Sequence, residues 1–320
     1  MKATIDANNT GIELRKRSSL TGRIKNELRQ NRYLYLLAIP VIAYYVLFCY
    51  VPMFGLVIGF KQYELGKSIM ECQWVGLKYF KEFFNGIYFG RLMRNTLLIS
   101  FYSILFGFPA PIIFSLLLNE LRKGRFKKTV QTVTYLPHFI SLVVICGMIV
   151  DFLSSDGVLT RMLTLFGGQK TNYVGDPRYF RAIYVISEIW QDVGWNSIIY
   201  LAALAGIDQQ LYEAAVIDGA SRWKQTIHIT LPGIMSTIMI MLIMRIGQVL
   251  SVGYEKIILL YGPGTFEVAD VISSYVYRMG IGQARYSFST AVGLFQSVVN
   301  VILLIVANTA SRRLSGTSLF

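Results

Sequence analysis

The sequence predicts an all-α protein that crosses a membrane several times. Of its 320 residues, 54% are hydrophobic and only 15% are charged, and the mean hydropathy is +0.48. Soluble domains are seldom so apolar, and disordered chains are far more polar. Six stretches also reach the length of about 20 residues that a helix needs to cross about 30 Å of hydrocarbon. Because no water is present there to satisfy backbone groups, we expect each stretch to be helical.

The six expected spans differ in the charge that they carry. Two of them hold charged residues: 182–205 contains only Glu188 and Asp192, and 229–252 contains only Arg245. The other four lack Asp, Glu, Lys and Arg altogether, and they are 33–60, 95–118, 129–150 and 286–311. The block 95–311 therefore holds five of the spans, and 33–60 precedes it.

The distribution of Lys and Arg predicts an orientation with both termini in the cytoplasm. Basic residues are denser in the segments that this orientation places inside than in those that it places outside. One short inner loop is especially basic and contains Arg122, Lys123, Arg125, Lys127 and Lys128. The inner segments are then 1–32, 119–128, 206–228 and 312–320, and the outer ones are 61–94, 151–181 and 253–285.

The net charge of +13 could indicate nucleic acid as a partner, but membrane lipid explains it better. Most basic residues flank the expected spans, where they hold orientation and meet anionic lipid. Residues 1–32 form a basic arm that is too long and polar for the start of a signal peptide. We expect no nucleic-acid binding.

Two outer loops have features of their own. The loop 61–94 is rich in aromatic residues, which favours a short amphipathic or interfacial helix, with a docking surface for an external protein as the alternative. In the loop 253–285, Asp270 interrupts a short apolar stretch, so we expect a re-entrant or capping helix there instead of a further span.

A short helix is expected in the inner segment 206–228. Gly206 breaks the preceding apolar helix, and Asp208 is a suitable N-cap for the next one. Leu211 and the small residues after it then supply a narrow apolar face that another backbone could approach closely. Pro232 falls just inside the following apolar segment, where its missing N–H costs least.

This segment resembles the EAA signature of permease subunits of ATP-binding-cassette (ABC) importers. Every defined position is filled: Glu213, Ala214, Ala215, Gly219, Ile229, Leu231 and Pro232. The resemblance implies the type I importer permease core over 95–311, with the first span 33–60 as an addition. It also implies that 206–228 is a cytoplasmic coupling loop that docks in a groove of a separate ATPase.

Other runs narrow the resemblance to permeases of carbohydrate importers that handle oligosaccharides and polysaccharide fragments. The runs are LMRNTLLIS (92–100), YLPHFIS (135–141), GWNSIIYLAALAGID (194–208) and ADVISSYVYR (269–278). The resemblance implies a bacterial cell membrane location and three kinds of partner: a second, similar permease, two ATPase subunits and an extracytoplasmic solute-binding protein. It implies no cofactor in this chain, because ATP and Mg²⁺ would be held by the ATPase.

Charged residues at membrane depth mark a candidate substrate path, since they rarely face lipid. Asp192 and Arg245 lie at similar depth, so we expect Arg245 to pair with Asp192 or with Glu188 on the same helix. A purely structural pair is the alternative. Aromatic and amide groups nearby suit a sugar, although Trp is also a frequent lipid anchor. These groups are Trp190, Gln191, Trp195, Asn196 and Gln248.

Two other classes of protein are less consistent with the sequence. An ion-coupled secondary transporter could use Glu188, Asp192 and Arg245 as a relay, but it gives no reason for the EAA spacing. A membrane-embedded enzyme would need a nucleophile, a metal set or an acid–base pair. Two isolated histidines and three scattered cysteines supply none of these. We expect a transport subunit that catalyses no reaction itself.

Overall fold

The computed structural model describes residues 30–121, 124–316 and 318–319, and this part of the chain is almost wholly helical. It divides into two compact units, Met1–Leu56 and Val57–Phe320. The expected basic arm 1–32 lies, apart from its last three residues, outside the described residues. Arg122 and Lys123 of the basic loop also lie outside them.

The described residues of the first unit form a helical run with only exposed or half-exposed side chains. The run comprises α2 (Arg32–Tyr45), the π-helical turn η1 (Val46–Tyr50) and α3 (Val51–Met53), and it continues as the 3-10 helix η2 (Phe54–Phe60). Pro40 lies inside α2 without ending it. The whole run Arg32–Phe60 is long and apolar enough to cross a membrane, as expected for the first span.

After the end of η2, the second unit contains two short strands and a first series of helices. The strands β1 (Lys61–Gln62) and β2 (Gln73–Trp74) pair antiparallel, with Lys61 opposite Trp74. The helices that follow are α4 (Lys78–Phe84), α5 (Phe89–Tyr102), η3 (Ser103–Gly107), α6 (Pro109–Glu120), α7 (Arg125–Tyr135), η4 (Leu136–Phe139), α8 (Leu142–Leu153) and α9 (Val158–Leu165). The aromatic loop thus contains a short helix, α4, and its Phe83 is buried in the core.

A second series of helices completes the unit. It comprises α10 (Pro177–Ala205), α11 (Gln209–Ile217), α12 (Arg222–Gln225), η5 (Thr226–Thr230), α13 (Leu231–Gly233), α14 (Met235–Ile246), α15 (Tyr254–Leu260), α16 (Phe266–Ala269), α17 (Ile272–Tyr277), η6 (Arg278–Gly282) and α18 (Tyr286–Ser315). The loop 253–285 is thus built of short helices, with Asp270 between α16 and α17, as its interrupted apolar pattern predicts.

The helix that we expected at 182–205 is the longest of those before α18. Asp176 caps α10 by accepting a hydrogen bond from the backbone N–H of Arg178, and Pro177 occupies its first turn. Hydrogen bonds from the side chain and backbone of Arg178 lower the pKa of the Asp176 carboxyl. The 29 residues of α10 extend about 43 Å at about 1.5 Å each, which exceeds the hydrocarbon thickness.

Four helical runs in the described residues are long and apolar enough to cross a membrane, and they are Arg32–Phe60, Phe89–Glu120, Leu142–Leu165 and Tyr286–Arg313. A fifth is the pair Arg222–Gly233 and Met235–Ile246, bent by 59°. Together with α10, whose charges lower its hydropathy, these are consistent with the six spans expected. The third span is displaced, however. The stretch 129–150 is split by η4, where Pro137 begins a 3-10 turn and Ile140 is extended.

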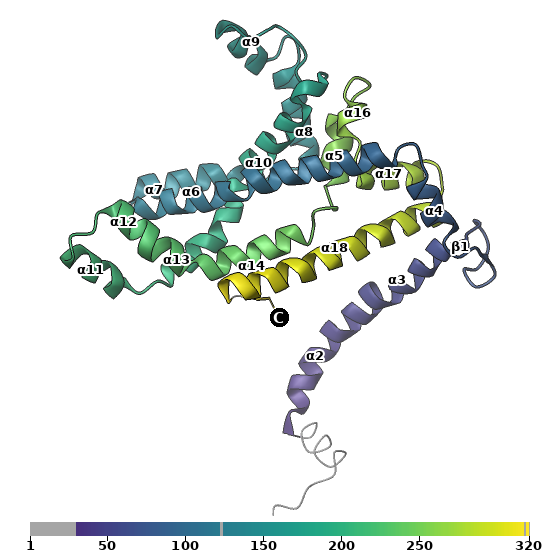
Figure 1. Cartoon of the computed structure of the whole chain (residues 1–320), viewed down its shortest axis with the longest axis horizontal. Helices are drawn as coiled ribbons and strands as arrows, with labels where there is room; N and C mark the ends of the chain where they lie inside the picture. The colour runs from purple at the N-terminus through teal and green to yellow at the C-terminus, as the bar shows by residue number, and fades with distance from the viewer. Residues whose placement is uncertain (1–29, 122–123, 317, 320) are drawn as a thin grey trace, which may run out of the picture. The chain divides into compact units, whose positions relative to one another are not determined.

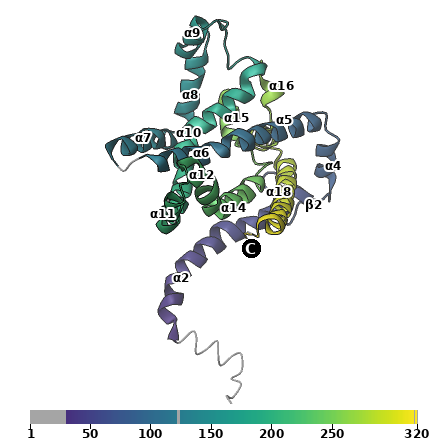
Figure 2. The ribbon, with the colours of Figure 1, turned by 60° about the vertical axis from the view of Figure 1, so that its left-hand side comes forward.

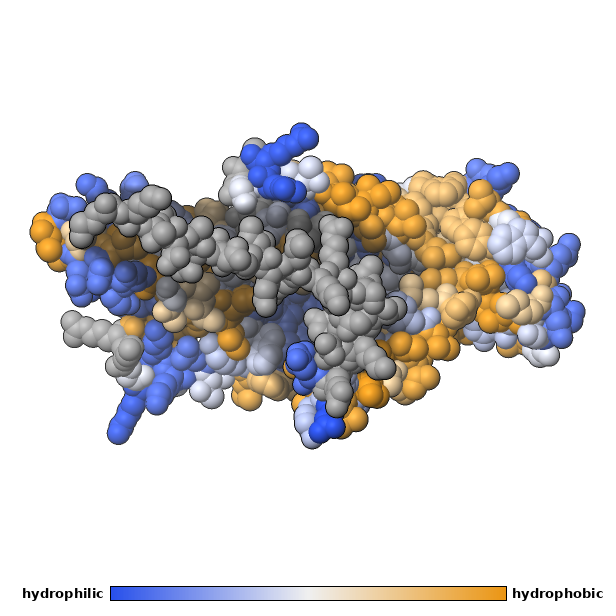
Figure 3. Space-filling view, turned by 90° about the horizontal axis from the view of Figure 1, so that it is seen from below, coloured by the Kyte–Doolittle hydropathy of each residue, from blue (hydrophilic) through white to orange (hydrophobic). Residues whose placement is uncertain are grey.

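Within the second unit, the long helices pack along one another and leave short helices at both ends (Figures 1 and 2). Helix α10 packs against α6 and α7, and α14 packs against α18. Helices α11 and α12 lie at one end, whereas α16 and α17 lie at the other. In the space-filling view, hydrophilic residues predominate at the end that holds α11 and α12, and hydrophobic residues cover much of the remaining surface (Figure 3). Exposed apolar surface of this kind is what contact with the hydrocarbon layer requires.

Close packing of α10 on α7 depends on Gly194. A Cβ atom added at this residue would lie 2.2 Å from the carbonyl oxygen of Thr134 in α7, closer than any real Cβ contact. Because that neighbour is backbone, it cannot rotate away as a side chain would. The two helices therefore touch through their main chains at this point.

We predict that Gly194→Ala forces α10 away from α7 and lowers the thermal stability of the detergent-purified protein by several degrees. The expected cost is about 1–3 kcal/mol, the usual range for overpacking. The matched control is Gly147→Ala in α8, where an added Cβ meets no atom within 4 Å. Melting followed by size-exclusion chromatography measures both. Equal melting temperatures for the two variants would contradict close contact of α10 and α7.

Candidate functional site

The segment 206–228, which we expect on the inner side, forms a helix–turn–helix beyond the end of α10. Helix α10 ends at Ala205, and Gly206 follows it. The expected N-cap of the next helix is present, since the carboxylate of Asp208 accepts a hydrogen bond from the backbone N–H of Gln210 at 3.0 Å. Helix α11 then contains Glu213, Ala214 and Ala215.

The outward side of α11 is exposed and largely apolar. Glu213 and Ala214 are exposed, Val216 is 62% exposed, and Ile217 is 86% exposed. Gly219 ends this surface with a φ of +72°, a left-handed conformation that favours glycine, and no atom lies within 4 Å of a Cβ placed there. A row of small and apolar groups with open space in front of it is a surface suited to another protein chain.

Among the remaining positions of the signature, Ile229 and Leu231 are half-buried, whereas Pro232 is exposed. Ile229 lies in η5, whereas Leu231 lies in α13 and packs against a buried cluster that includes Leu204 of α10. Pro232 lies in α13, which continues the helical run Arg222–Gly233 directly after the π-helical turn η5. The signature thus divides into an exposed half, on α11, and a second half that Leu231 anchors to the bundle.

Three contacts hold the segment in place. The hydroxyl groups of Tyr212 and Thr230 share a hydrogen bond of 2.9 Å, which joins α11 to η5. The guanidinium group of Arg222 donates to the carboxylate of Glu120 at 3.0 Å and joins α12 to the end of α6. A Cβ added at Gly233 would lie 2.8 Å from the side chain of Ile207, so this side chain packs directly against the backbone of Gly233.

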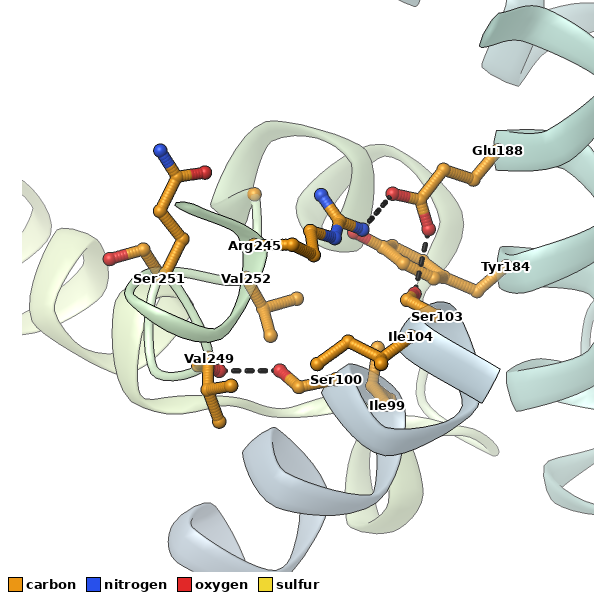
Figure 4. Close-up of a pocket in the computed structure, with 12 residues that line it drawn as sticks. Ile99, Ser100, Ser103, Ile104, Tyr184, Glu188, Arg245, Val249, Ser251 and Val252 are labelled. Atoms are coloured by element: carbon orange, nitrogen blue, oxygen red, sulfur yellow. Dashed lines mark hydrogen bonds and ion pairs between the residues drawn. The ribbon is translucent and has the colours of Figure 1, made fainter. Parts of the chain in front are cut away.

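The charged residues of the expected spans meet in the middle of the bundle. The guanidinium group of Arg245 in α14 donates to Glu188 Oε1 in α10 at 2.6 Å, and Ser103 Oγ in η3 donates to Glu188 Oε2 at 2.7 Å (Figure 4). Both oxygens of one carboxylate are therefore satisfied by two other elements. Tyr184 lies one turn before Glu188 and lines the same small hollow.

Asp192 takes a different partner. Its carboxylate lies 2.9 Å from Nδ1 of His138, which belongs to the 3-10 turn η4. The imidazole ring of His138 also stacks on the indole of Trp195, with ring centroids 4.5 Å apart and planes within 6°. This contact fixes the face that Trp195 presents, so the break in the third expected span gives η4 a role in the site.

These groups border a cavity of about 440 Å³, a volume typical of small-molecule sites. Aromatic faces from His138 and Trp195 form part of its wall. Polar groups line it as well, namely Glu188, Asp192, Asn196, Arg245 and Gln248. Trp190 does not line the cavity and is 46% exposed. Within the described part of the chain, no three His, Cys, Asp or Glu residues are placed to hold a metal ion.

Sequence reasoning missed several residues of both sites. Ser103 is a neutral residue in an apolar run, and only its spacing of three from Ser100 could have placed it on the polar face. His138 lies 54 residues from Asp192, and nothing local relates them. Tyr212 and Arg222 fall inside the EAA segment, yet the signature does not specify those positions.

The arrangement matches a known family. The sequence profile described as "Binding-protein-dependent transport system inner membrane component" matches residues 83–316, which include both the EAA segment and the cavity. The chain belongs to this family. It is therefore a membrane-embedded permease subunit of a binding-protein-dependent ABC importer.

Individual relatives resemble this permease over nearly its whole length. Protein LplB of Bacillus subtilis (strain 168) is 44% identical over 294 residues, which cover 92% of each chain. The polygalacturonan/rhamnogalacturonan transport system permease protein YteP of the same organism is 42% identical over 299 residues, which cover 93% of each chain.

Solved structures agree with the fold. A chain from a bacterial ABC transporter involved in the import of the acidic polysaccharide alginate matches with a TM-score of 0.84 and 44% identity, over 92% of this permease and 99% of that chain. A chain from the alginate transporter in complex with an alginate pentasaccharide-bound periplasmic protein matches with a TM-score of 0.85 and 43% identity, over 93% and 100%. The all-helical fold of an importer permease is thereby confirmed.

We predict that Arg245 is energetically coupled to Glu188 and much less to Asp192. Arg245→Gln and Glu188→Gln should each lower stability, and the double variant should cost less than the sum by about 1 kcal/mol, because each single variant leaves one charge without its partner. Thermal unfolding of the purified permease complex measures the stabilities of the wild type, the two single variants and the double variant, from which the coupling is calculated. A cycle of Arg245→Gln with Asp192→Asn is the control, and a coupling as large as that with Glu188 would contradict the geometry.

Proposed function

We propose that this permease forms half of the translocation pathway of an ATP-driven importer of carbohydrates, in the form of oligosaccharides. The observation that carries the proposal is the cavity of about 440 Å³ between α10, α14 and η4. Trp195 and His138 offer flat rings to the C–H faces of a sugar, and Asn196 and Gln248 offer amides to its hydroxyl groups. The names of the relatives, which refer to polygalacturonan, rhamnogalacturonan and alginate, support the same class of substrate.

We place α11 and α12 in the cytoplasm, with both termini on the same side. The basic residues Arg125, Lys127 and Lys128 at the start of α7, together with Arg222 and Lys224 in α12, support this orientation by the positive-inside rule. The opposite end, with α16 and α17, then faces the solute-binding protein.

The partners follow from the exposed half of the EAA segment. A complete importer of this kind contains two ATPase subunits, and the surface of Glu213, Val216, Ile217 and Gly219 is the part of this chain that would dock in one of them. ATP and Mg²⁺ would bind to those subunits, with no cofactor in this chain. A second, similar permease would supply the other half of the pathway, and a solute-binding protein would deliver the sugar.

The contacts around α11 suggest how a movement of the ATPase would reach the cavity. Helix α10 carries Glu188, Asp192 and Trp195 and is joined to α11 only through 206–208, whereas α14 carries Arg245 and is joined to α12 through the bend of 59°. Both cavity walls are therefore attached to the docking segment. Closing of the ATPase would shift α11 and, through Leu231 and Ile207, the inner ends of α10 and α14, and so alternate the side to which the cavity opens.

We predict that Gly219→Ala lowers sugar uptake and sugar-stimulated ATP hydrolysis by about tenfold or more, because loss of 1.4 kcal/mol at the docking surface is tenfold. Gly167→Ala is the matched control: Gly167 also has a left-handed φ, +87°, and open space around an added Cβ. Both variants carry the same backbone strain, and uptake into proteoliposomes compares them. Glu213→Gln should also reduce uptake.

Membrane insertion should be normal in all of these variants, as measured by the amount of permease in the membrane fraction. Uptake that is equal in Gly219→Ala and Gly167→Ala would argue against docking through α11. Uptake that persists without any ATPase subunit would favour the ion-coupled transporter instead.

A second prediction concerns the cavity. Trp195→Ala should raise the sugar concentration needed for half-maximal ATPase stimulation by about tenfold, since it removes a stacking face from the cavity. Trp190→Ala in the same helix is the control, because Trp190 is exposed to a similar degree but lies outside the cavity. If both tryptophans serve only as lipid anchors, the two variants will behave alike.

A further inference from the structure

A second polar hollow lies at the end of the bundle opposite to α11, where α5, α10 and α16 pack together (Figure 1). Its volume is about 350 Å³. Three arginines line it, Arg91 and Arg94 from the first turns of α5 and Arg181 from the first turns of α10. Neither the EAA segment nor the central cavity accounts for this cluster.

Arg181 is held in position by a fixed amide. Its Nη2 donates to Oδ1 of Asn95 at 3.1 Å. Asn95 is only 2% exposed, and its Nδ2 donates to the backbone oxygens of Glu267 at 2.8 Å and Asp270 at 3.0 Å. Because both carbonyl groups require the amide nitrogen, the amide oxygen must face Arg181. The guanidinium group is thus fixed without a carboxylate.

Arg91 is held by aromatic rings. Its guanidinium carbon lies 4.9 Å from the centre of the Tyr88 ring and 5.4 Å from that of Phe266. Its closest carboxylate is Asp270, at 3.5 Å, but that buried group makes shorter contacts of 2.9 and 3.1 Å with Arg278. One carboxylate therefore serves two arginines, and positive charge is in excess.

The other arginines of the hollow lack an acidic partner. Arg94 lies close enough to Arg181 for the two positive charges to repel each other. In the described part of the chain, neither forms an ion pair, and the Nε atoms of Arg91 and Arg181 are buried without an acceptor. Glu267 is the one carboxylate among the lining residues. Placing like charges together in this way is unfavourable unless an anion joins them.

The hollow is at a level that a dissolved ligand can reach. The run Phe89–Glu120 has 32 residues and extends about 48 Å at about 1.5 Å per residue, so it is longer than the hydrocarbon layer of about 30 Å. Arg91 and Arg94 lie within its first six residues and precede the uncharged stretch 95–118, which we expect to lie in the hydrocarbon. In the proposed orientation this is the outer side, from which sugar arrives.

We propose that this arginine hollow binds a carboxylate group of an acidic sugar residue in the arriving oligosaccharide. The inference rests on the proposed carbohydrate transport and adds the charge of the substrate. Planar guanidinium groups match a carboxylate with paired, charge-assisted hydrogen bonds, and the volume admits a sugar ring as well as its carboxylate. The arginines thereby select acidic glycans before the central cavity receives them.

The test uses the complete importer in nanodiscs of phosphatidylcholine, without the solute-binding protein. The probes are a galacturonate trisaccharide and its carboxyl-reduced, neutral counterpart, and calorimetric titration measures their binding. Arg94→Gln and Arg181→Gln should each weaken binding of the acidic trisaccharide by about tenfold and leave the neutral one unchanged. Arg94→Lys, which keeps the charge, should lose less. The control is Arg161→Gln in α9, an exposed arginine outside the hollow, which should change neither.

Several results would overturn the proposal. One is unchanged binding of the acidic probe in both variants, and another is an equal loss for both probes. An effect that needs phosphatidylglycerol in the nanodisc would assign the hollow to a lipid headgroup. Weaker docking of the solute-binding protein with unchanged sugar binding would assign it to that interface. Import of neutral sugars alone would remove this inference but leave the proposed function intact, whereas ATP-driven import of no carbohydrate would remove both.

Discussion

The low dielectric of the hydrocarbon layer is the constraint on which the rest of this structure depends. It requires every spanning segment to be helical, and it requires every charge at that depth to find a partner or water. Helix α10 carries two carboxylates into the bundle, and each is met by a different group: Glu188 by Arg245 and Ser103, and Asp192 by His138. The polar cavity exists where these partners converge, because charged groups there cannot face lipid.

The same helix connects three regions that serve different purposes. Near its beginning, Arg181 contributes to the arginine hollow; in its middle, Glu188, Asp192 and Trp195 border the cavity; and beyond its end, Asp208 caps α11. A single rigid element of about 43 Å can carry a displacement from one end to the other without deforming. In the proposed function this continuity links the ATPase, the sugar and the outer surface.

Features that depend on local chemistry were predictable from the sequence. Asp208 determines the start of α11 through capping, which acts within a few residues. Features that depend on distant contacts were not. A hydropathy average runs through the break at Leu136–Ile140, because Leu136, Phe139 and Ile140 offset Pro137 and His138. His138 pairs with Asp192, and Arg91 and Arg94 converge with Arg181. These residues are far apart in the chain, and no local feature of the sequence indicates that they come together.

The central claim is that the exposed side of α11 becomes buried against an ATPase in the cytoplasm, and cysteine labelling tests it most directly. Val216→Cys would be introduced after replacing Cys49, Cys72 and Cys146, the three native cysteines. In inside-out vesicles, a membrane-impermeant maleimide should label this cysteine when the permease is alone and fail to label it when the ATPase subunits are assembled. Equal labelling in both states, or labelling from the outside of intact cells, would contradict the account.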